Sequence, residues 1–223
     1  AAEQGFVAIC APREDGTGRV TDVRCGEPIE FPFDGEIMPP VGHWSNYPMT
    51  VARRMARNFP EVGRGAEIAF GSDLPPASGM SSSSAMIIAF FLALAEVNGI
   101  WERSEFQQNV TSLVELASYL ATNENGQSFG SLEGDRGVGT AGGSEDHTAI
   151  LCCHPGTLSQ YAYCPARHVG DVALPSSYTF VIASSGVVAE KTGAAMAAYN
   201  RASRLAGIAA EVWREATGRS DPH

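Results

Sequence analysis

Residues 73–85 read Asp73-Leu74-Pro75-Pro76-Ala77-Ser78-Gly79-Met80-Ser81-Ser82-Ser83-Ser84-Ala85, a loop of small residues that runs straight into an apolar segment, 86–97. The paired prolines stiffen the start of the loop, and Gly79 frees the backbone and lets a ligand come close. The N–H groups at the start of the following helix have no acceptor within that helix and carry partial positive charge. This arrangement favours an anion such as a nucleotide phosphate, although a serine-rich cap or linker has the same composition.

The loop differs from the common phosphate-binding P-loop, because no lysine follows its glycine. It resembles instead the second motif of the GHMP small-molecule kinases, which the galactokinase branch writes as Pro-x-x-x-Gly-Leu-Ser-Ser-Ser. Only Met80 for leucine and Ser84 for alanine depart from that pattern. The resemblance implies ATP as cofactor and Mg²⁺ assisted by Ser82. It also implies that the ATP phosphates are wrapped by Pro76, Ser78, Gly79, Met80, Ser81, Ser82, Ser83 and Ser84.

A second polar cluster, Gly142-Gly143-Ser144-Glu145-Asp146-His147-Thr148, precedes an apolar run that we expect to be a strand. An acidic surface turn is one interpretation of it. The cluster also resembles the Gly-Gly-x-Asp-Gln motif of galactokinases, in which the aspartate faces the sugar hydroxyl. The resemblance implies Asp146 as the catalytic carboxylate. Glu145 is the competing alignment, because one extra residue follows the glycines. On the same basis Gly142, Gly143 and His147 are candidate substrate contacts.

A carboxylate in this place can orient the acceptor hydroxyl and take its proton. Most of the catalysis of phosphoryl transfer should come from positioning and charge neutralisation.

Glu124 and Tyr199 complete the candidate site. The family holds Mg²⁺ with a glutamate before its glycine loop, so the resemblance implies Glu124 as a ligand beside Ser82, although a solvated glutamate at a helix end fits the sequence equally well. Such hard oxygen ligands suit Mg²⁺. Tyr199-Asn200-Arg201 resembles the Tyr-Asn-x-Arg segment on the sugar side of galactokinases. Tyr199 is therefore a candidate sugar contact, with a core tyrosine as the alternative.

The resemblance covers most of the chain but only the ATP-loop-bearing domain of the family. The opening family motif Gly-Arg-x-Asn-x-x-Gly-Glu-His-x-Asp-Tyr and the third, glycine-rich motif have no counterpart here. We therefore expect residues 1–223 to form a single GHMP-kinase-like N-terminal domain, as a fragment of a larger two-domain kinase. The expected function is ATP-dependent phosphorylation of a monosaccharide hydroxyl. The alternative is a non-catalytic sensor or scaffold that binds a nucleotide or a sugar.

Composition agrees with a folded enzyme. Hydrophobic residues make up 44% and charged residues 18% of the chain, which argues against disorder. The formal net charge of -10 argues against nucleic acid as a partner. The five cysteines are odd in number and form no Cys-x-x-Cys pair, so we expect a reducing, cytoplasmic location and no structural zinc. The longest apolar run is shorter than the roughly 20 residues of a membrane span, and we expect a buried central helix there.

The predicted fold class is α+β, with a mixed sheet packed on helices; the resemblance implies the ribosomal-protein-like β-α-β fold of GHMP N-terminal domains. In the first half we expect strands at 5–11, 19–23 and 66–70, a hairpin turn at Asp15-Gly16, and a helix at 47–58 capped by Asn46 with Arg53, Arg54 and Arg57 on a solvated face.

In the second half, Ser104 and Gln107 form a capping box, which predicts that one helix begins there and continues through Leu120. Beyond it we expect a long loop at 125–143, a hairpin of strands 149–153 and 158–163, a strand at 178–183 and a helix at 194–216.

Overall fold

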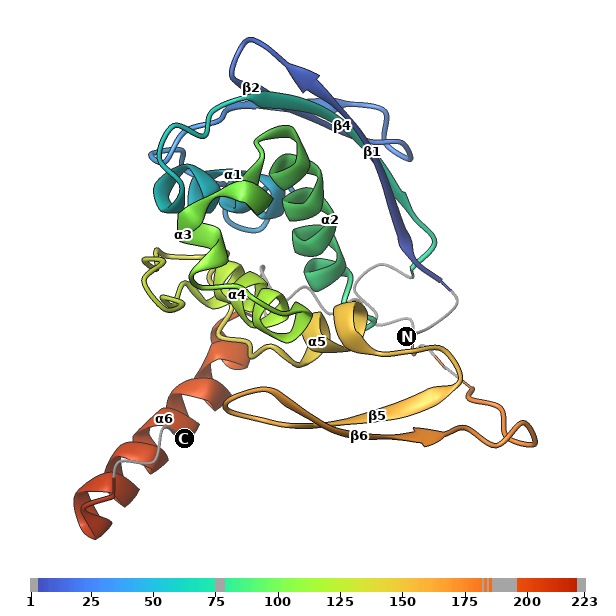
Figure 1. The fold of residues 1–223 in the computed structure, drawn as a ribbon, viewed down its shortest axis with the longest axis vertical. Helices are drawn as coiled ribbons and strands as arrows, with labels where there is room; N and C mark the ends of the chain where they lie inside the picture. The colour runs from blue at the N-terminus through green and yellow to red at the C-terminus, as the bar shows by residue number, and fades with distance from the viewer. Residues whose placement is uncertain (1–3, 75–78, 182, 184, 186–195, 220–223) are drawn as a thin grey trace.

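A four-stranded mixed sheet forms one outer layer of the protein (Figure 1). The computed structural model describes residues 4–74, 79–181, 183, 185 and 196–219. Across the sheet the strands follow in the order β1 (Phe6–Arg13), β4 (Gly65–Ser72), β2 (Thr17–Asp22) and β3 (Pro28–Pro32). β4 pairs antiparallel with β1 and parallel with β2, while β2 and β3 are antiparallel. The α+β class with a mixed sheet is confirmed.

The hairpin predicted at Asp15-Gly16 is wrong. The chain turns there, but β4 enters between β1 and β2, which therefore do not pair. β4 buries Ile68 and Phe70 almost completely, so the central place in the sheet removes the most apolar surface from water. A Cβ on Gly65 would lie 2.2 Å from the carbonyl oxygen of Thr17, so only glycine allows β4 to begin this close to β2.

Helices α1 (Asn46–Asn58) and α2 (Ser82–Val97) cover the inner face of the sheet (Figure 1). The prediction of a buried central helix after the serine loop is confirmed, since α2 packs on β1, β4 and α1. Its Phe90 ring meets Phe70 of β4 edge to face, with ring centroids 5.4 Å apart. α2 is thus held between the sheet and the later helices, which fixes the position of its first turn.

Two predictions for α1 are wrong. Ser45 rather than Asn46 is the N-cap residue, and the Asn46 side chain instead donates to the carbonyl of Val138 and accepts from Thr50. The arginines were expected on a solvated face, which holds for the exposed Arg57, but Arg53 and Arg54 are 3% and 0% exposed. They are buried because a loop from the second half of the chain covers this face and supplies their hydrogen-bond acceptors.

The helix predicted from Ser104 to Leu120 is two helices. A 3₁₀ turn, η1 (Ile100–Glu102), leads into the short α3 (Ser104–Gln107), and α4 (Leu113–Asn125) begins after a break. The capping box lies at Ser112 and Glu115: the Ser112 hydroxyl accepts from the N–H of Glu115, and the Glu115 carboxylate reaches back to the N–H of Thr111. This stronger cap starts the long helix at Leu113, so the prediction from Ser104 and Gln107 is wrong.

A long loop over 126–143 follows α4, as predicted, but the segment after it is a helix and not a strand. α5 (Glu145–Cys152) occupies the run expected as the first strand of a hairpin. Ser144 precedes it and two carboxylates occupy its first turn, which is favourable at a helix N-terminus. The hairpin is formed instead by β5 (Thr157–Ala162) and β6 (Arg167–Ala173).

The final helix, α6 (Met196–Thr217), confirms the prediction of a helix at 194–216. Residues 194 and 195 of the predicted range lie outside the described part of the chain. The strand predicted at 178–183 is not formed at 178–181 or 183, and residue 182 lies outside the description. All five cysteines are free thiols. In the part of the chain that the structure describes, no helix is long and apolar enough to cross a membrane.

Candidate active site

The serine loop enters α2 through two residues in the left-handed backbone region. Gly79 has φ +80°, and Ser81, the N-cap residue, has φ +56°. This conformation is costly for a serine, by ~1–2 kcal/mol. The first intrahelical bond runs from the N–H of Ala85 to the carbonyl of Ser81, at 3.0 Å, so the N–H groups of the first turn point out of the helix end. Pro76 and Ser78 of the predicted phosphate site lie outside the described residues, while Met80, Ser82 and Ser83 are half-buried.

Glu124 reaches this helix end from the last turn of α4. Its side chain is buried, and the Ser84 hydroxyl donates to its Oε1 at 3.3 Å. The alternative of a solvated glutamate is therefore wrong. Ser82 lies two positions before Ser84, which turns its side chain about 200° away around the helix. Of the two predicted metal ligands, Glu124 therefore reaches the serine turn, and it does so through Ser84 rather than through Ser82.

Gly142 lies between Glu124 and the first turn of α6. A Cβ on Gly142 would be 3.4 Å from the Tyr199 hydroxyl and 3.5 Å from Oε2 of Glu124. The neighbouring Asn200 holds the same stretch, because its amide donates to the carbonyl of Gly139 and accepts from the N–H of Ala141. The structure therefore brings together α2, the end of α4, the glycine loop and the start of α6. A shallow depression of about 460 Å³ borders this cluster at Ala141, Asn200, Arg201 and Arg204.

The first turn of α5 points three consecutive side chains in three directions, as a helix requires. Glu145 is exposed, Asp146 is half-buried and His147 is completely buried. Burial lowers the pKa of His147 to about 4, against the opposing effect of the neighbouring Asp146 carboxylate. His147 is thus neutral near pH 7, and both of its ring nitrogens lack a hydrogen-bond partner among the described residues. His147 was a candidate sugar contact; in the structure its side chain lies beneath the helix surface.

Two further side chains lie against the glycine loop and were not predicted. The Asn125 amide donates to the carbonyl of Gly142 at 2.8 Å. The Tyr163 hydroxyl, from the turn after β5, would lie 2.7 Å from a Cβ on Gly143. In the sequence, Asn125 is only weakly indicated as a contact of the loop, by its place at a helix end. Tyr163 is not indicated at all, because its position depends on how the β5–β6 hairpin folds back.

Residues 46–151 match the family model described as the N-terminal domain of GHMP kinases. Over these residues the chain is similar to the N-terminal domains of GHMP kinases. The match begins at α1 and ends in α5, so it includes the serine loop, Glu124 and Asp146. The fold expected from the resemblance is thereby confirmed.

The proteins that this chain is similar to include galactokinases. The galactokinase of Actinobacillus pleuropneumoniae serotype 3 is 32% identical over 121 residues, which cover 45% of this chain and 32% of that protein. The galactokinase of Dictyostelium discoideum is 24% identical over 189 residues, which cover 84% of this chain and 32% of that protein. The chain thus spans about a third of the length of these curated relatives.

A solved structure shares the fold. The galactokinase of Lactococcus lactis, whose crystal structure is a complex with galactose, superposes with a TM-score of 0.51 at 21% identity. The superposition covers 78% of this chain and 39% of that protein. The architecture extends beyond the segment matched by the family model.

Proposed function

We propose that this protein transfers the terminal phosphoryl group of ATP to a hydroxyl of a monosaccharide, and that this chain carries the phosphate loop and the catalytic aspartate. The observation that carries the proposal is the meeting of Ser84, Glu124, Gly142 and Tyr199 at the start of α2. These four residues, predicted for the nucleotide, metal and sugar sides of the site, come from four separate elements, and their proximity supports the proposal. The galactokinase relatives support the sugar as acceptor.

In this proposal the ATP phosphates lie at the N-terminus of α2, where Gly79 and Ser81 to Ser83 present backbone N–H groups and hydroxyls. The protein as a whole carries a net charge of -10. The helix end supplies a local partial positive charge that favours the phosphates. The left-handed Ser81 is consistent with a loop shaped for a ligand, because backbone strain of this kind concentrates at functional sites.

Asp146 is proposed to face the acceptor hydroxyl. It sits in the first turn of α5, three residues after Gly143, and is half-buried where Glu145 is exposed. A partly desolvated carboxylate is better suited to hold a hydroxyl in line with a phosphate than one that is fully in water. Gly142, Gly143 and Tyr199 are proposed to line the sugar, and the buried His147 to support the turn that carries Asp146.

The donor set fits Mg²⁺. Glu124 is a buried carboxylate beside serine hydroxyls, and hard oxygen ligands of this kind are the ones that Mg²⁺ takes, together with phosphate oxygens and water. Glu124 would hold it beside the Ser84 hydroxyl, whereas the predicted ligand Ser82 faces about 200° away around α2. The bound ion would neutralise charge that develops on the phosphates. No cluster of three or more His, Cys, Asp or Glu side chains suited to a metal occurs in the described part of the chain.

The test is to assay the product of the complete gene against a panel of monosaccharides with Mg²⁺-ATP, measuring ADP and phosphorylated sugar separately. Phosphorylation of one or a few sugars, lost in Asp146→Asn, is the expected result. Binding of nucleotide or sugar with no phosphorylated product would instead establish the non-catalytic sensor or scaffold.

A further inference from the structure

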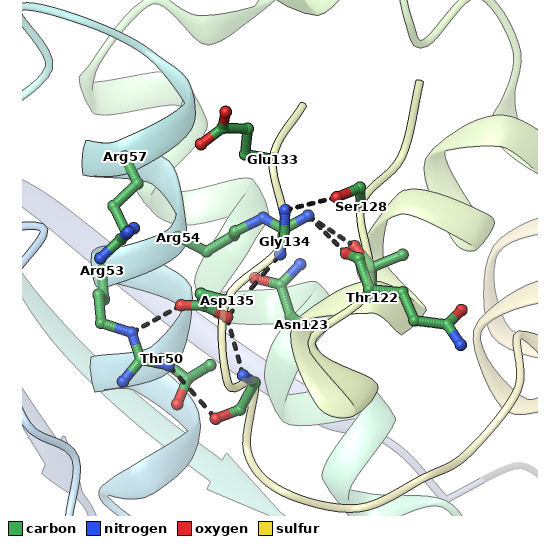
Figure 2. A network of polar contacts seen from close by, with 12 residues as sticks. Thr50, Arg53, Arg54, Arg57, Thr122, Asn123, Ser128, Glu133, Gly134 and Asp135 are labelled. Atoms are coloured by element: carbon green, nitrogen blue, oxygen red, sulfur yellow. Dashed lines mark hydrogen bonds and ion pairs between the residues drawn. The ribbon is translucent and has the colours of Figure 1, made fainter. Parts of the chain in front are cut away.

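A buried network of charges ties α1 to the loop that follows α4 (Figure 2). The Nε of Arg53 donates to Asp135 Oδ2 at 2.7 Å, and its Nη2 donates to the carbonyl of Gly137 at 3.3 Å. Nη1 of Arg54 lies 3.8 Å from Asp135 Oδ1. The side chains of Arg53, Arg54 and Asp135 are all at least 95% buried. One carboxylate thus holds two arginines that the sequence alone assigns to solvent.

Arg54 also spans the network toward α4. Its Nε donates to Asn58, and its Nη2 donates to the Thr122 hydroxyl and to the carbonyl of Gln127, at 2.7, 3.2 and 2.9 Å. The amide of Asn58 in turn donates to the carbonyl of Glu133 at 2.9 Å. The loop is therefore fastened to α1 at Gln127, Glu133 and Asp135. Figure 2 shows the bond from Arg53 to Asp135, and the bond within the loop from the N–H of Gly134 to Ser128.

The fastened loop runs back along the end of α4 in a fixed register. The N–H of Val138 donates to the carbonyl of Asn123, and the N–H of Gly139 donates to the carbonyl of Glu124, at 2.9 and 3.1 Å. These bonds satisfy carbonyls that a helix end leaves without an intrahelical partner. A Cβ on Gly137 would lie 2.5 Å from the carbonyl of Glu124, so the two segments touch backbone to backbone. The position of Glu124 therefore depends on the position of residues 137–139.

We propose that Asp135 is a positioning residue: by fastening residues 134–139 to Arg53 and Arg54 of α1, its carboxylate sets the register in which Glu124 and Gly142 meet the start of α2. Its own side chain orders the turn, since its Oδ1 also accepts from the N–H of Gly137 at 2.8 Å. The consequence for phosphoryl transfer rests on the proposed function. The consequence for the loop does not.

The test compares Asp135→Asn with Glu36→Gln. Both variants replace a carboxylate that pairs with an arginine of α1, but the Glu36–Arg57 pair is exposed and lies 3.5 Å apart. Arg53→Lys is the second variant, because it keeps the positive charge beside Asp135 while losing the planar fork that reaches Asp135 and Gly137 together. It remains informative if the uncompensated arginines prevent Asp135→Asn from folding.

Amide hydrogen exchange is measured well below each melting temperature. The amides of Val138 and Gly139 should exchange at least about 10-fold faster in Asp135→Asn and Arg53→Lys, with those of α2 unchanged. In the kinase assay kcat should fall about 10-fold or more and the Mg²⁺ concentration for half-activation should rise, because a misplacement of ~1 Å can cost on the order of 10² in rate. KM for ATP should change little.

Wild-type exchange at Val138 and Gly139 together with wild-type kcat, in variants that only melt earlier, would overturn the proposal and leave Asp135 as a structural ion pair. If the wild-type protein phosphorylates no sugar, the proposed function fails by itself, and the exchange rates still decide whether Asp135 fixes the loop.

Discussion

The chain up to α5 and the chain after it treat their apolar side chains in opposite ways. In the first part Ile87, Phe90 and Phe91 of α2 are completely buried. In the second part the apolar stripe of α6 is open to solvent, with Val212 and Trp213 59% and 53% exposed, and no residue of that helix is buried. α2 is an almost unbroken apolar run, whereas α6 carries its apolar residues at helical spacing. Spacing therefore predicts which face of a helix is apolar, and only the fold shows whether anything in the chain covers it.

Polar contacts join these two parts, and those made by Asn200 lie at the candidate site. The Tyr161 hydroxyl donates to the carbonyl of Cys152 at the end of α5, and Asn200 of α6 brackets residues 139–141. The first part supplies the serine loop and Glu124, and the second part supplies Tyr199. Changes in the first part should therefore affect nucleotide and metal, while changes at the border should affect the sugar.

The largest effect is expected at the border, at Asp146. Asp146→Asn should reduce turnover by ~10²–10⁴, because it removes a positioned acid–base group, while ATP binding stays nearly unchanged. The matched control is Glu145→Gln, whose side chain is exposed and should matter little. Turnover numbers and ATP dissociation constants of both variants check this. An inactive Glu145→Gln with an active Asp146→Asn would move the catalytic role to Glu145, and full activity in both would reduce the cluster to an acidic turn.

The contrast in burial predicts a contrast in stability. Phe90→Ala should lower the free energy of unfolding by about 3–5 kcal/mol, because it leaves a cavity against Phe6 and Phe70. Trp213→Ala, on the exposed stripe of α6, should change it by no more than about 0.5 kcal/mol. Denaturant unfolding of both variants measures the difference. A large loss in Trp213→Ala would show that the stripe is covered in solution.

The sequence predicted the elements whose signals are local. The turn from Gly79 into α2, the loop before Gly142 and the helix that contains Tyr199 are all confirmed, because turn residues and apolar periodicity act over a few positions.

Features set by distant parts of the chain were predicted wrongly. The turn at Asp15-Gly16 gives no information about β4, which lies some fifty residues later in the chain and pairs between the two strands. The run after Asp146 is apolar and short, which fits a strand as well as a helix, and its packing on α4 decides for the helix. In the sequence, Arg53 and Arg54 have the pattern of a solvated helix face. In the structure they are buried because the loop that carries Asp135 covers them.

The candidate site shows the same difference between features with local sequence signals and features set by distant parts of the chain. Glu124 was found through a resemblance and was placed by the fold beside Ser84, a partner that no spacing in the sequence indicates, since forty residues separate the two. Tyr163 and Asn125 were missed because they contact Gly143 and Gly142 only through tertiary folding. A site assembled from four elements cannot be read from any one of them.

Within the first part, Glu124→Gln should weaken Mg²⁺ activation. The amide keeps the size of the side chain and can still accept from Ser84, but it removes the negative charge. Loss of an outer partner of a metal typically costs ~10–100-fold in metal affinity, and loss of a ligand should cost at least as much. Mg²⁺ titration of the kinase rate checks this, with Glu133→Gln in the neighbouring loop as control. An activation curve equal to that of the wild type would remove Glu124 from the metal site and leave the serines.

The smallest effect concerns His147, and it tests whether the side chain is buried or is free to contact the sugar. Burial lowers the pKa of its imidazole to about 4 from the ordinary 6.5, so between these values the unfolded chain binds a proton that the folded protein does not. Folding stability should therefore fall as the pH is lowered through this window, by about 2 kcal/mol at pH 5. His147→Gln cannot titrate and should lose less stability than the wild type between pH 7 and pH 5. His168→Gln, which removes an exposed imidazole, is the control and should follow the wild type. Equal pH profiles for His147→Gln and the wild type would mean that His147 is solvated in solution, and it would then return to the group of candidate sugar contacts beside Asp146.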